Sequence, residues 1–133
     1  MTTFNLNVVS PDGQVIDKEV EFVVLPSVDG ELGILANHAP LIAGLEAGVM
    51  RYTEDGKVYK IAICGGFVEV AKNKVSVLAN TAEKAEKINV ERALAAKERA
   101  QKRLQDKSPD VDVLRAEMAL KRAVARLKTT GKL

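Results

Sequence analysis

The sequence has few of the residues on which enzyme chemistry most often depends. Its 133 residues include one cysteine, one histidine and no tryptophan. A single cysteine excludes an internal disulfide, and a single histidine leaves no pair for a metal site or for a nucleophile with its base. The sequence also lacks a Walker phosphate loop, paired Cys-x-x-Cys motifs and an HExxH motif. We therefore expect no catalytic residue and no bound metal.

The two rare side chains have simpler interpretations. Cys64 ends the apolar run of residues 61–63 and precedes two glycines, which is typical of a small buried residue. His38 could ligate a metal, but Glu31 is its nearest second ligand, and metal sites need more ligands than that. Cys64 is therefore expected to be structural.

Long apolar runs and C-terminal aromatics are missing as well. No stretch of 18 apolar residues and no signal-peptide pattern is present, so we expect no direct membrane insertion and any membrane association to be through partners. Residues 83–133 contain no Phe, Tyr or Trp, and their basic residues are interleaved with acids, which disfavours nucleic-acid binding.

The first 82 residues show the alternation of β-strands. Phe4, Leu6 and Val8 alternate with polar residues, and residues 15–25 predict one or two more strands. Strand patterns follow at residues 48–52, 57–64, 67–71 and 74–79, separated by turn signals at residues 54–56, 65–66 and 72–73. Short strands with turns about every ten residues favour an antiparallel β-sandwich.

From Asn80 and Thr81 onward the period changes to that of helices. Residues 82–87 are compatible with a short helix, and Asn89 is a plausible N-cap for a helix over residues 90–106. The charge balance changes too: residues 1–82 carry 6 basic and 10 acidic side chains, whereas residues 83–133 carry 14 and 8. The two parts should attract each other.

A second helix is predicted after a turn near residues 107–109. Ser108 precedes Pro109 at the expected first helical position, with Asp110 and Asp112 in the first turn, and Gly131 is a possible stop. The fold class is thus mixed, β then α. A β-sandwich domain of residues 1–82 is followed by an antiparallel two-helix hairpin of residues 83–133.

The two predicted helices repeat one spacing of arginines, at steps of seven and four residues: Arg92, Arg99 and Arg103, then Arg115, Arg122 and Arg126. At about 100° per residue, each trio falls within an arc of about 40°. An apolar row runs beside each trio. If these apolar rows pack against each other in an antiparallel hairpin, both arginine rows lie on the same exposed face.

This face would place Arg92 near Arg126 and Arg103 near Arg115. A solvated charged surface is the simpler interpretation. However, lysine would serve solubility equally well, whereas the planar fork of arginine suits carboxylate and phosphate groups. We interpret the face as an anion site.

The most individual stretch of the first part is GELGILANHAPL at residues 30–41. It resembles the glycine-bounded loop of the epsilon subunit of bacterial F-type ATP synthases, which is called delta in mitochondria. The resemblance extends to VVSPDGQVI at residues 8–16, GGFVEV at 65–70, VSVLANTAE at 75–83 and the predicted hairpin. It therefore covers nearly the whole chain.

The resemblance implies a non-catalytic rotor subunit at the cytoplasmic face of the bacterial membrane. Its sandwich would couple the gamma subunit of the central stalk to the ring of c subunits, with Glu31 and His38 at that interface. A purely structural role remains the alternative for His38. The hairpin would alternate between a compact form and an extended form whose basic face, including Arg103 and Arg115, meets the alpha/beta catalytic hexamer and blocks ATP hydrolysis.

Several family members bind ATP on the compact hairpin through the pattern I/L-D-x-x-R-A. The matching positions here are Glu83, Ile88, Asn89, Arg92, Ala93, Arg99, Arg122 and Arg126. The departure is Asn89, which keeps an acceptor oxygen but lacks the charge of aspartate. No covalent cofactor is expected. ATP is the expected regulatory ligand, with its magnesium dependence left open.

Three other interpretations stay open at this stage. The arginine face could serve only the acidic surface of the catalytic head. The chain could be an autonomous ATP sensor, which would not copurify with a stalk or hexamer. The third and weakest alternative is a nucleic-acid adapter, whose affinity would fall steeply with salt.

Overall fold

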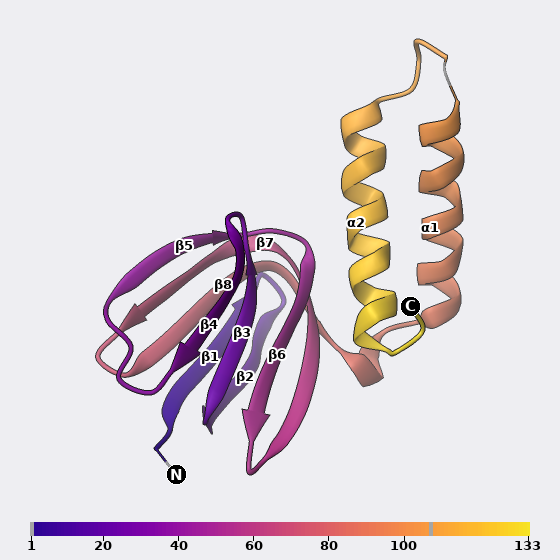
Figure 1. Ribbon diagram of the computed structural model, residues 1–133. Helices are drawn as coiled ribbons and strands as arrows, with labels where there is room; N and C mark the ends of the chain where they lie inside the picture. Colours follow the sequence, from indigo (N-terminus) through magenta and orange to yellow (C-terminus); the bar gives the residue numbers. More distant parts are fainter. Residues whose placement is uncertain (1, 107) are drawn as a thin grey trace.

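The computed structural model describes residues 2–106 and 108–133 (Figure 1). Eight strands precede the helices in this part of the chain. The strands are β1 (Phe4–Ser10), β2 (Gly13–Val20), β3 (Phe22–Ser27), β4 (Gly30–Leu35), β5 (Leu41–Leu45), β6 (Gly48–Glu54), β7 (Lys57–Ala71) and β8 (Lys74–Lys84). The short 3-10 helix η1 (Ala85–Lys87) leads to α1 (Val90–Gln105) and α2 (Val113–Thr129).

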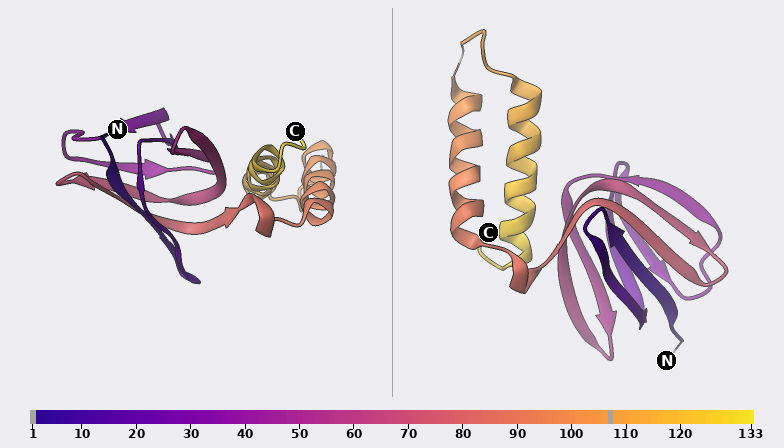
Figure 2. Two further views of the ribbon diagram at one scale, coloured as in Figure 1. Left: turned by 90° about the horizontal axis from the view of Figure 1, so that it is seen from below. Right: turned by 180° about the vertical axis from the view of Figure 1, so that it is seen from behind.

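The strands form one sheet that folds over into a sandwich (Figures 1 and 2). The strand order is β2-β1-β8-β7-β5-β3-β4, and β6 pairs with β3 and β7. The fold-over depends on β7, which pairs with β6 through residues 57–63 and with β5 through residues 66–70. All pairs are antiparallel except β1 with β8. The predicted sandwich is therefore confirmed, with one parallel pair added.

The core lies between the two layers. Alternate residues of each strand point inward, as the period of two requires. Its largest fully buried side chains include Phe4, Leu6, Leu25, Ile34, Met50, Ile61 and Ile63. Strand β5 was missing from the predicted strands, because its five residues are too short to show a clear alternation.

The sequence predicted a turn at residues 65 and 66 that separates two strands. This prediction is wrong. Strand β7 runs through it, with positive φ angles of 71° at Gly65 and 107° at Gly66. A Cβ on Gly66 would collide with the carbonyl oxygen of Leu78 on the neighbouring strand. The glycines therefore lie within a continuous strand, where the chain passes from pairing with β6 to pairing with β5.

The predicted change of period at Asn80 and Thr81 is also wrong. Strand β8 continues to Lys84, because the long β7 offers it a partner: Thr81 pairs with Cys64 and Lys84 pairs with Ile61. Only residues 85–87 form the short helix expected within residues 82–87. Pairing with β7 here overrides the local preference.

The antiparallel hairpin is confirmed, and its first helix starts as predicted. The Asn89 side chain accepts a hydrogen bond from the backbone N–H of Arg92 at 3.0 Å, so it caps α1. Gly131 follows the end of α2 with a positive φ of 76°, and the N–H of Lys132 bonds to the carbonyl of Leu127. Gly131 is thus the predicted stop.

The predicted start of the second helix is wrong by four residues. The Ser108 side chain accepts from the N–H of Asp110, and the Ser108 carbonyl accepts from the N–H of Val111, so these groups form a turn. Asp112 is the actual N-cap, accepting from the N–H of Arg115 at 3.0 Å. Lys107, part of the predicted turn, lies outside the described residues.

Helix α2 lies between α1 and the sandwich (Figures 1 and 2). The seam between the helices buries mainly alanines, with one larger side chain, Leu127. The alanines are Ala93, Ala100, Ala116 and Ala123. On the sandwich, Ala62 and Cys64 alternate with the core residues Ile61 and Ile63 along β7 and so face outward, toward α2. Cys64 is 7% exposed, as expected of a structural cysteine.

Among the described residues, neither α1 nor α2 combines the length and the hydrophobicity that a membrane-spanning helix requires.

Candidate anion site of the docked hairpin

A cavity of about 320 Å³ opens where the hairpin joins the sandwich. The end of β8, the linker η1, the first turns of α1 and the last turns of α2 all contribute to it. Its lining residues are Glu83, Lys87, Asn89, Arg92, Ala93, Ala96, Arg99 and Arg126.

Helix α1 supplies one wall of the cavity. Arg92, Ala96 and Arg99 follow one another at steps of four and three residues, so they share one side of the helix. The alanines at positions 93 and 96 are small and leave room between the arginines. Both arginines are exposed, so their guanidinium groups are free to reach a ligand.

The other wall comes from α2 and β8. The Arg126 Nε donates to a Glu83 carboxylate oxygen at 2.6 Å, and the two side chains are 28% and 32% exposed. This charge-assisted contact joins the hairpin directly to the sandwich. It holds Arg126 at the cavity and lowers the positive charge there by one unit.

Charge still favours an anion in this cavity. Four cationic side chains and one carboxylate line it, giving an excess of three positive charges. The N-terminus of α1 adds its partial positive charge on the same side. Phosphate groups, which accept several charge-assisted hydrogen bonds, are the ligands that this arrangement suits best.

The structure brings most of the predicted ATP-contacting residues together. Glu83, Asn89, Arg92, Ala93, Arg99 and Arg126 all line the cavity. Ile88 is 8% exposed and anchors the linker without lining the cavity. Arg92 and Arg126 are neighbours, as the matched rows predicted.

The prediction that both arginine rows share one exposed face is wrong for Arg122. It lines a separate cavity of about 430 Å³ between α2 and the sandwich, together with Met118 and Cys64. Arg122 is offset from Arg126 by about 40° around the helix, and α2 contacts both α1 and the sandwich. Because of this offset, Arg126 lies at the anion cavity and Arg122 lies at the cavity against the sandwich.

Arg103 and Arg115 lie together at the tip of the hairpin, as predicted. The cavity that they line, of about 390 Å³, also contains three acidic residues, Asp106, Asp110 and Asp112. The tip is therefore not a purely basic surface, because acids from the turn offset its arginines.

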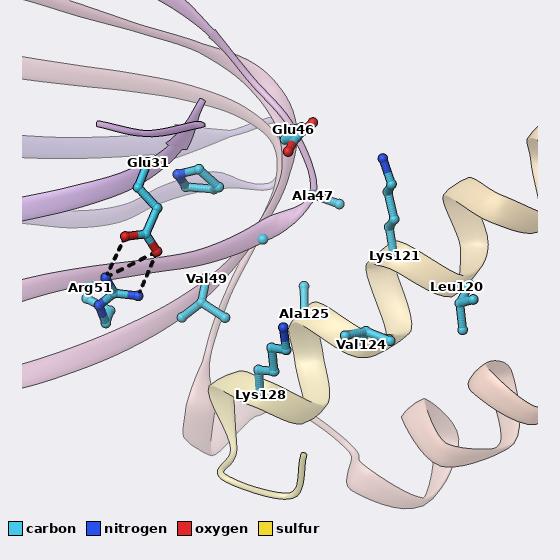
Figure 3. Close-up of a pocket in the computed structure, with 12 residues that line it drawn as sticks. Glu31, Glu46, Ala47, Val49, Arg51, Leu120, Lys121, Val124, Ala125 and Lys128 are labelled. Carbon is cyan, nitrogen blue, oxygen red and sulfur yellow. Dashed lines mark hydrogen bonds and ion pairs between the residues drawn. The ribbon is translucent and has the colours of Figure 1, made fainter. Parts of the chain in front are cut away.

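Glu31 and His38 lie toward opposite ends of β4. Both oxygens of Glu31 accept from the Arg51 guanidinium at 3.3 Å on the exposed surface (Figure 3). His38 Nδ1 lies 2.7 Å from the Ala39 carbonyl oxygen. Among the described residues, no group of three or more His, Cys, Asp or Glu side chains is placed to hold a metal ion.

A groove of about 480 Å³ separates α2 from β6 and the start of β4 (Figure 3). Lys121 and Lys128 project from the side of α2 that faces the sandwich, and Glu46 and Glu31 lie on the opposite wall. Arg51, which pairs with Glu31, lines the same wall, and the ion pairs of the described residues include none between these lysines and glutamates. The docked hairpin therefore leaves an incompletely filled interface with the sandwich. Sequence reasoning missed these lysines, although their spacing of seven places them on one side of the helix.

Lys87 is the other residue that sequence reasoning missed. It belongs to the linker, outside either helix, so the helical spacing that identified the arginines could not include it.

The fold and site define a class of protein: a β-sandwich body with a helical hairpin whose docking forms an anion cavity. Family models agree with both parts. The ATP synthase delta/epsilon chain beta-sandwich domain matches residues 3–85, and the long alpha-helix domain matches residues 86–131.

Individual relatives agree with the family models. The ATP synthase epsilon chain of Desulfitobacterium hafniense strain Y51 is 63% identical over 125 residues, covering 94% of each chain. That of Bacillus licheniformis is 50% identical over 127 residues, covering 96% of this chain and 97% of the relative. The chain therefore belongs to the ATP synthase delta/epsilon family and is an epsilon-type subunit of the central stalk.

Solved structures show the same fold at lower identity. A chain in the Euglena gracilis mitochondrial ATP synthase matches with a TM-score of 0.83 at 24% identity, covering 96% of this chain and 81% of the other. A chain in the Tetrahymena thermophila mitochondrial ATP synthase central stalk and c-ring matches with a TM-score of 0.58 at 14% identity, covering 97% and 96%.

Proposed function

We propose that the sandwich couples the gamma subunit of the central stalk to the ring of c subunits, as a non-catalytic part of the rotor. Family membership supports this role, as do the structural neighbours, which come from assemblies containing a c-ring. Exposed Glu31 and half-exposed His38 are candidate contacts. Such a subunit is located at the cytoplasmic face of the bacterial membrane, where its partner subunits hold it.

The hairpin is a regulatory element that alternates between this docked form and an extended form. In the extended form its tip, with Arg103 and Arg115, reaches the alpha/beta catalytic hexamer and blocks ATP hydrolysis. The docked interface supports a reversible arrangement, because it leaves a groove of about 480 Å³ and includes the partly exposed Arg126–Glu83 ion pair. Such interfaces separate more readily than a packed core.

ATP stabilises the docked form. The observation that carries this proposal is the composition of the anion cavity, which combines Glu83 of the sandwich, Arg92 and Arg99 of α1, and Arg126 of α2. The full set exists only when the hairpin is docked. ATP therefore favours docking through its differential affinity, and each tenfold shift in population requires about 1.4 kcal/mol.

The size of the cavity is compatible with this ligand. Its volume of about 320 Å³ lies at the lower end of the range of about 300–1,000 Å³ typical of small-molecule sites. Its exposed arginines allow the rest of the nucleotide to extend along the surface of α1.

Calorimetric titration of the full-length chain with ATP tests the site. Arg126→Ala removes one cation and leaves the Glu83 carboxylate without its partner, 2.6 Å away in the structure. Losing a hydrogen bond to a charged group costs about 1.5–3 kcal/mol, so we expect affinity to fall by about tenfold or more. Titrations with and without Mg²⁺ determine whether the metal accompanies the nucleotide.

The matched control is Arg103→Ala, which removes the same charge at the hairpin tip. It should leave ATP affinity within about twofold, because Arg103 lines the cavity at the tip and not the anion cavity. Equal affinities for wild type and Arg126→Ala would exclude Arg126 from the site. Copurification from membranes with stalk and ring subunits tests the rotor role separately, and its failure would favour an autonomous ATP sensor.

A further inference from the structure

Lys87 occupies a special place at the anion cavity, because it comes from the linker between sandwich and hairpin. It is the last residue of η1, and the N–H of Ile88 bonds to the Ala85 carbonyl at 3.2 Å to close this turn. Ile88 is buried and Ala85 is half-buried. The exposed Lys87 therefore lies in a turn whose two ends, Ala85 and Ile88, are held in place, and it lines the cavity.

The ammonium group of Lys87 is available to a ligand. The described residues form three ion pairs, Lys18 with Glu54, Arg51 with Glu31, and Arg126 with Glu83. Lys87 belongs to none of them. A Lys side chain in this setting acts as a mobile point charge, which suits a phosphate oxygen without demanding one fixed geometry.

The cations of the cavity are distributed over three segments of the chain. Lys87 belongs to the linker, Arg92 and Arg99 to α1, and Arg126 to α2. A chain of phosphates offers more oxygen atoms to these three segments than one phosphate group does. Asn89 adds to this preference, because its side chain caps α1 and brings no negative charge to the cavity.

We propose that Lys87 is a phosphate-contacting residue and that, with the three arginines, it makes the cavity a site for polyphosphate groups. This inference rests on the proposed ATP-dependent docking, and it adds a residue and a consequence to it. A ligand held by Lys87 ties the linker to both helices. Extension of the hairpin must change the linker, so it breaks this contact along with those to α2.

The test compares Lys87→Gln with Lys84→Gln in the full-length chain. Lys84→Gln removes the same charge three residues earlier in the chain. Lys84, however, lines a different cavity, together with Tyr59 and Lys60. Calorimetric titrations use ATP, inorganic tripolyphosphate and inorganic phosphate at low and high salt. We expect Lys87→Gln to weaken binding of ATP and tripolyphosphate by about tenfold at low salt, with a smaller difference at high salt.

The controls should behave differently. Lys84→Gln should stay within about twofold of wild type, and Lys87→Arg, which keeps the charge, should retain most of the affinity. Inorganic phosphate should bind at least about tenfold more weakly than tripolyphosphate, because it reaches fewer of the cations.

The outcomes separate this inference from the proposed function. Wild-type affinity in Lys87→Gln, or equal losses in Lys87→Gln and Lys84→Gln, would overturn the role of Lys87 while leaving ATP binding intact. Lys87-dependent binding of tripolyphosphate without binding of ATP would support the polyphosphate site and reject ATP sensing. Binding of neither ligand by the wild type would overturn both.

Discussion

The sandwich and the hairpin are held together by different kinds of packing. The sandwich encloses large side chains such as Phe4, Leu25 and Ile63 between its layers. The seam of the hairpin is made mainly of alanines, with Leu127 as its large fully buried side chain. Hydrophobic stabilisation follows buried apolar area at about 25 cal/mol per Å², so the seam gains much less per residue. We therefore expect that separating the helices costs less free energy than unfolding the sandwich.

The interface between the hairpin and the sandwich is also less completely packed than the sandwich core. Of the two α-helices in the described residues, α2 is the one that packs on the sandwich (Figure 2). It covers Ala62 and Cys64 but leaves an open groove beside β6 (Figure 3). The Arg126–Glu83 pair adds electrostatic attraction. We infer that docking depends on a few contacts, which a ligand or a partner can outweigh.

The largest expected effect is in the sandwich core. Leu25 is 0% exposed, and Leu25→Ala should lower the free energy of unfolding of the sandwich by about 2–5 kcal/mol, through lost burial and a residual cavity. Urea denaturation followed by circular dichroism measures this change. Leu35→Ala is the control, because Leu35 is 62% exposed and its loss should change stability by less than about 0.5 kcal/mol. Similar losses in both variants would show that the core is not where stability resides.

A smaller and strictly local effect is expected at the cap of α1. Asn89→Ala removes the acceptor for the Arg92 N–H and should cost about 1 kcal/mol of helix stability. Amide hydrogen exchange should become faster in α1 and stay unchanged in the sandwich. Asn89→Asp keeps a capping oxygen and should restore the slow exchange. Faster exchange throughout the sandwich would contradict the separate stabilities of the two parts.

The fold was predictable wherever local pattern and tertiary pairing agree. Alternation identified β1 from Phe4, Leu6 and Val8, and the cap at Asn89 identified the start of α1. The errors arose where contacts with residues distant in the sequence determine where a strand or helix ends. Gly65 and Thr81 carry turn or boundary signals, but the pairing of β7 with β8 extends both strands past them. At the hairpin turn, Ser108 bonds within a local turn instead of capping α2.

The candidate site was predictable to the extent that it lies on α1. Arg92 and Arg99 follow from helical spacing alone, and Arg126 follows from matching the two rows. Arg122 lies against the sandwich because α2 packs on the sandwich as well as on α1. Val124, an apolar residue outside the predicted seam, carries that signal, because it lines the groove against the sandwich. Leu120 was predicted to lie in the seam between the helices, but it lines the same groove. Lys87 had no such signal, since the linker has no regular period.

The native thiol provides the most direct test of ATP-dependent docking. Cys64 is 7% exposed and lines a cavity with Met118 and Arg122 of α2, so it should react with a chromogenic thiol reagent mainly when the hairpin leaves the sandwich. We predict that saturating ATP slows the labelling of the full-length chain, and that Arg126→Ala abolishes this protection. A labelling rate that is the same with and without saturating ATP, in a chain shown to bind ATP, would contradict the coupling of ligand binding to docking.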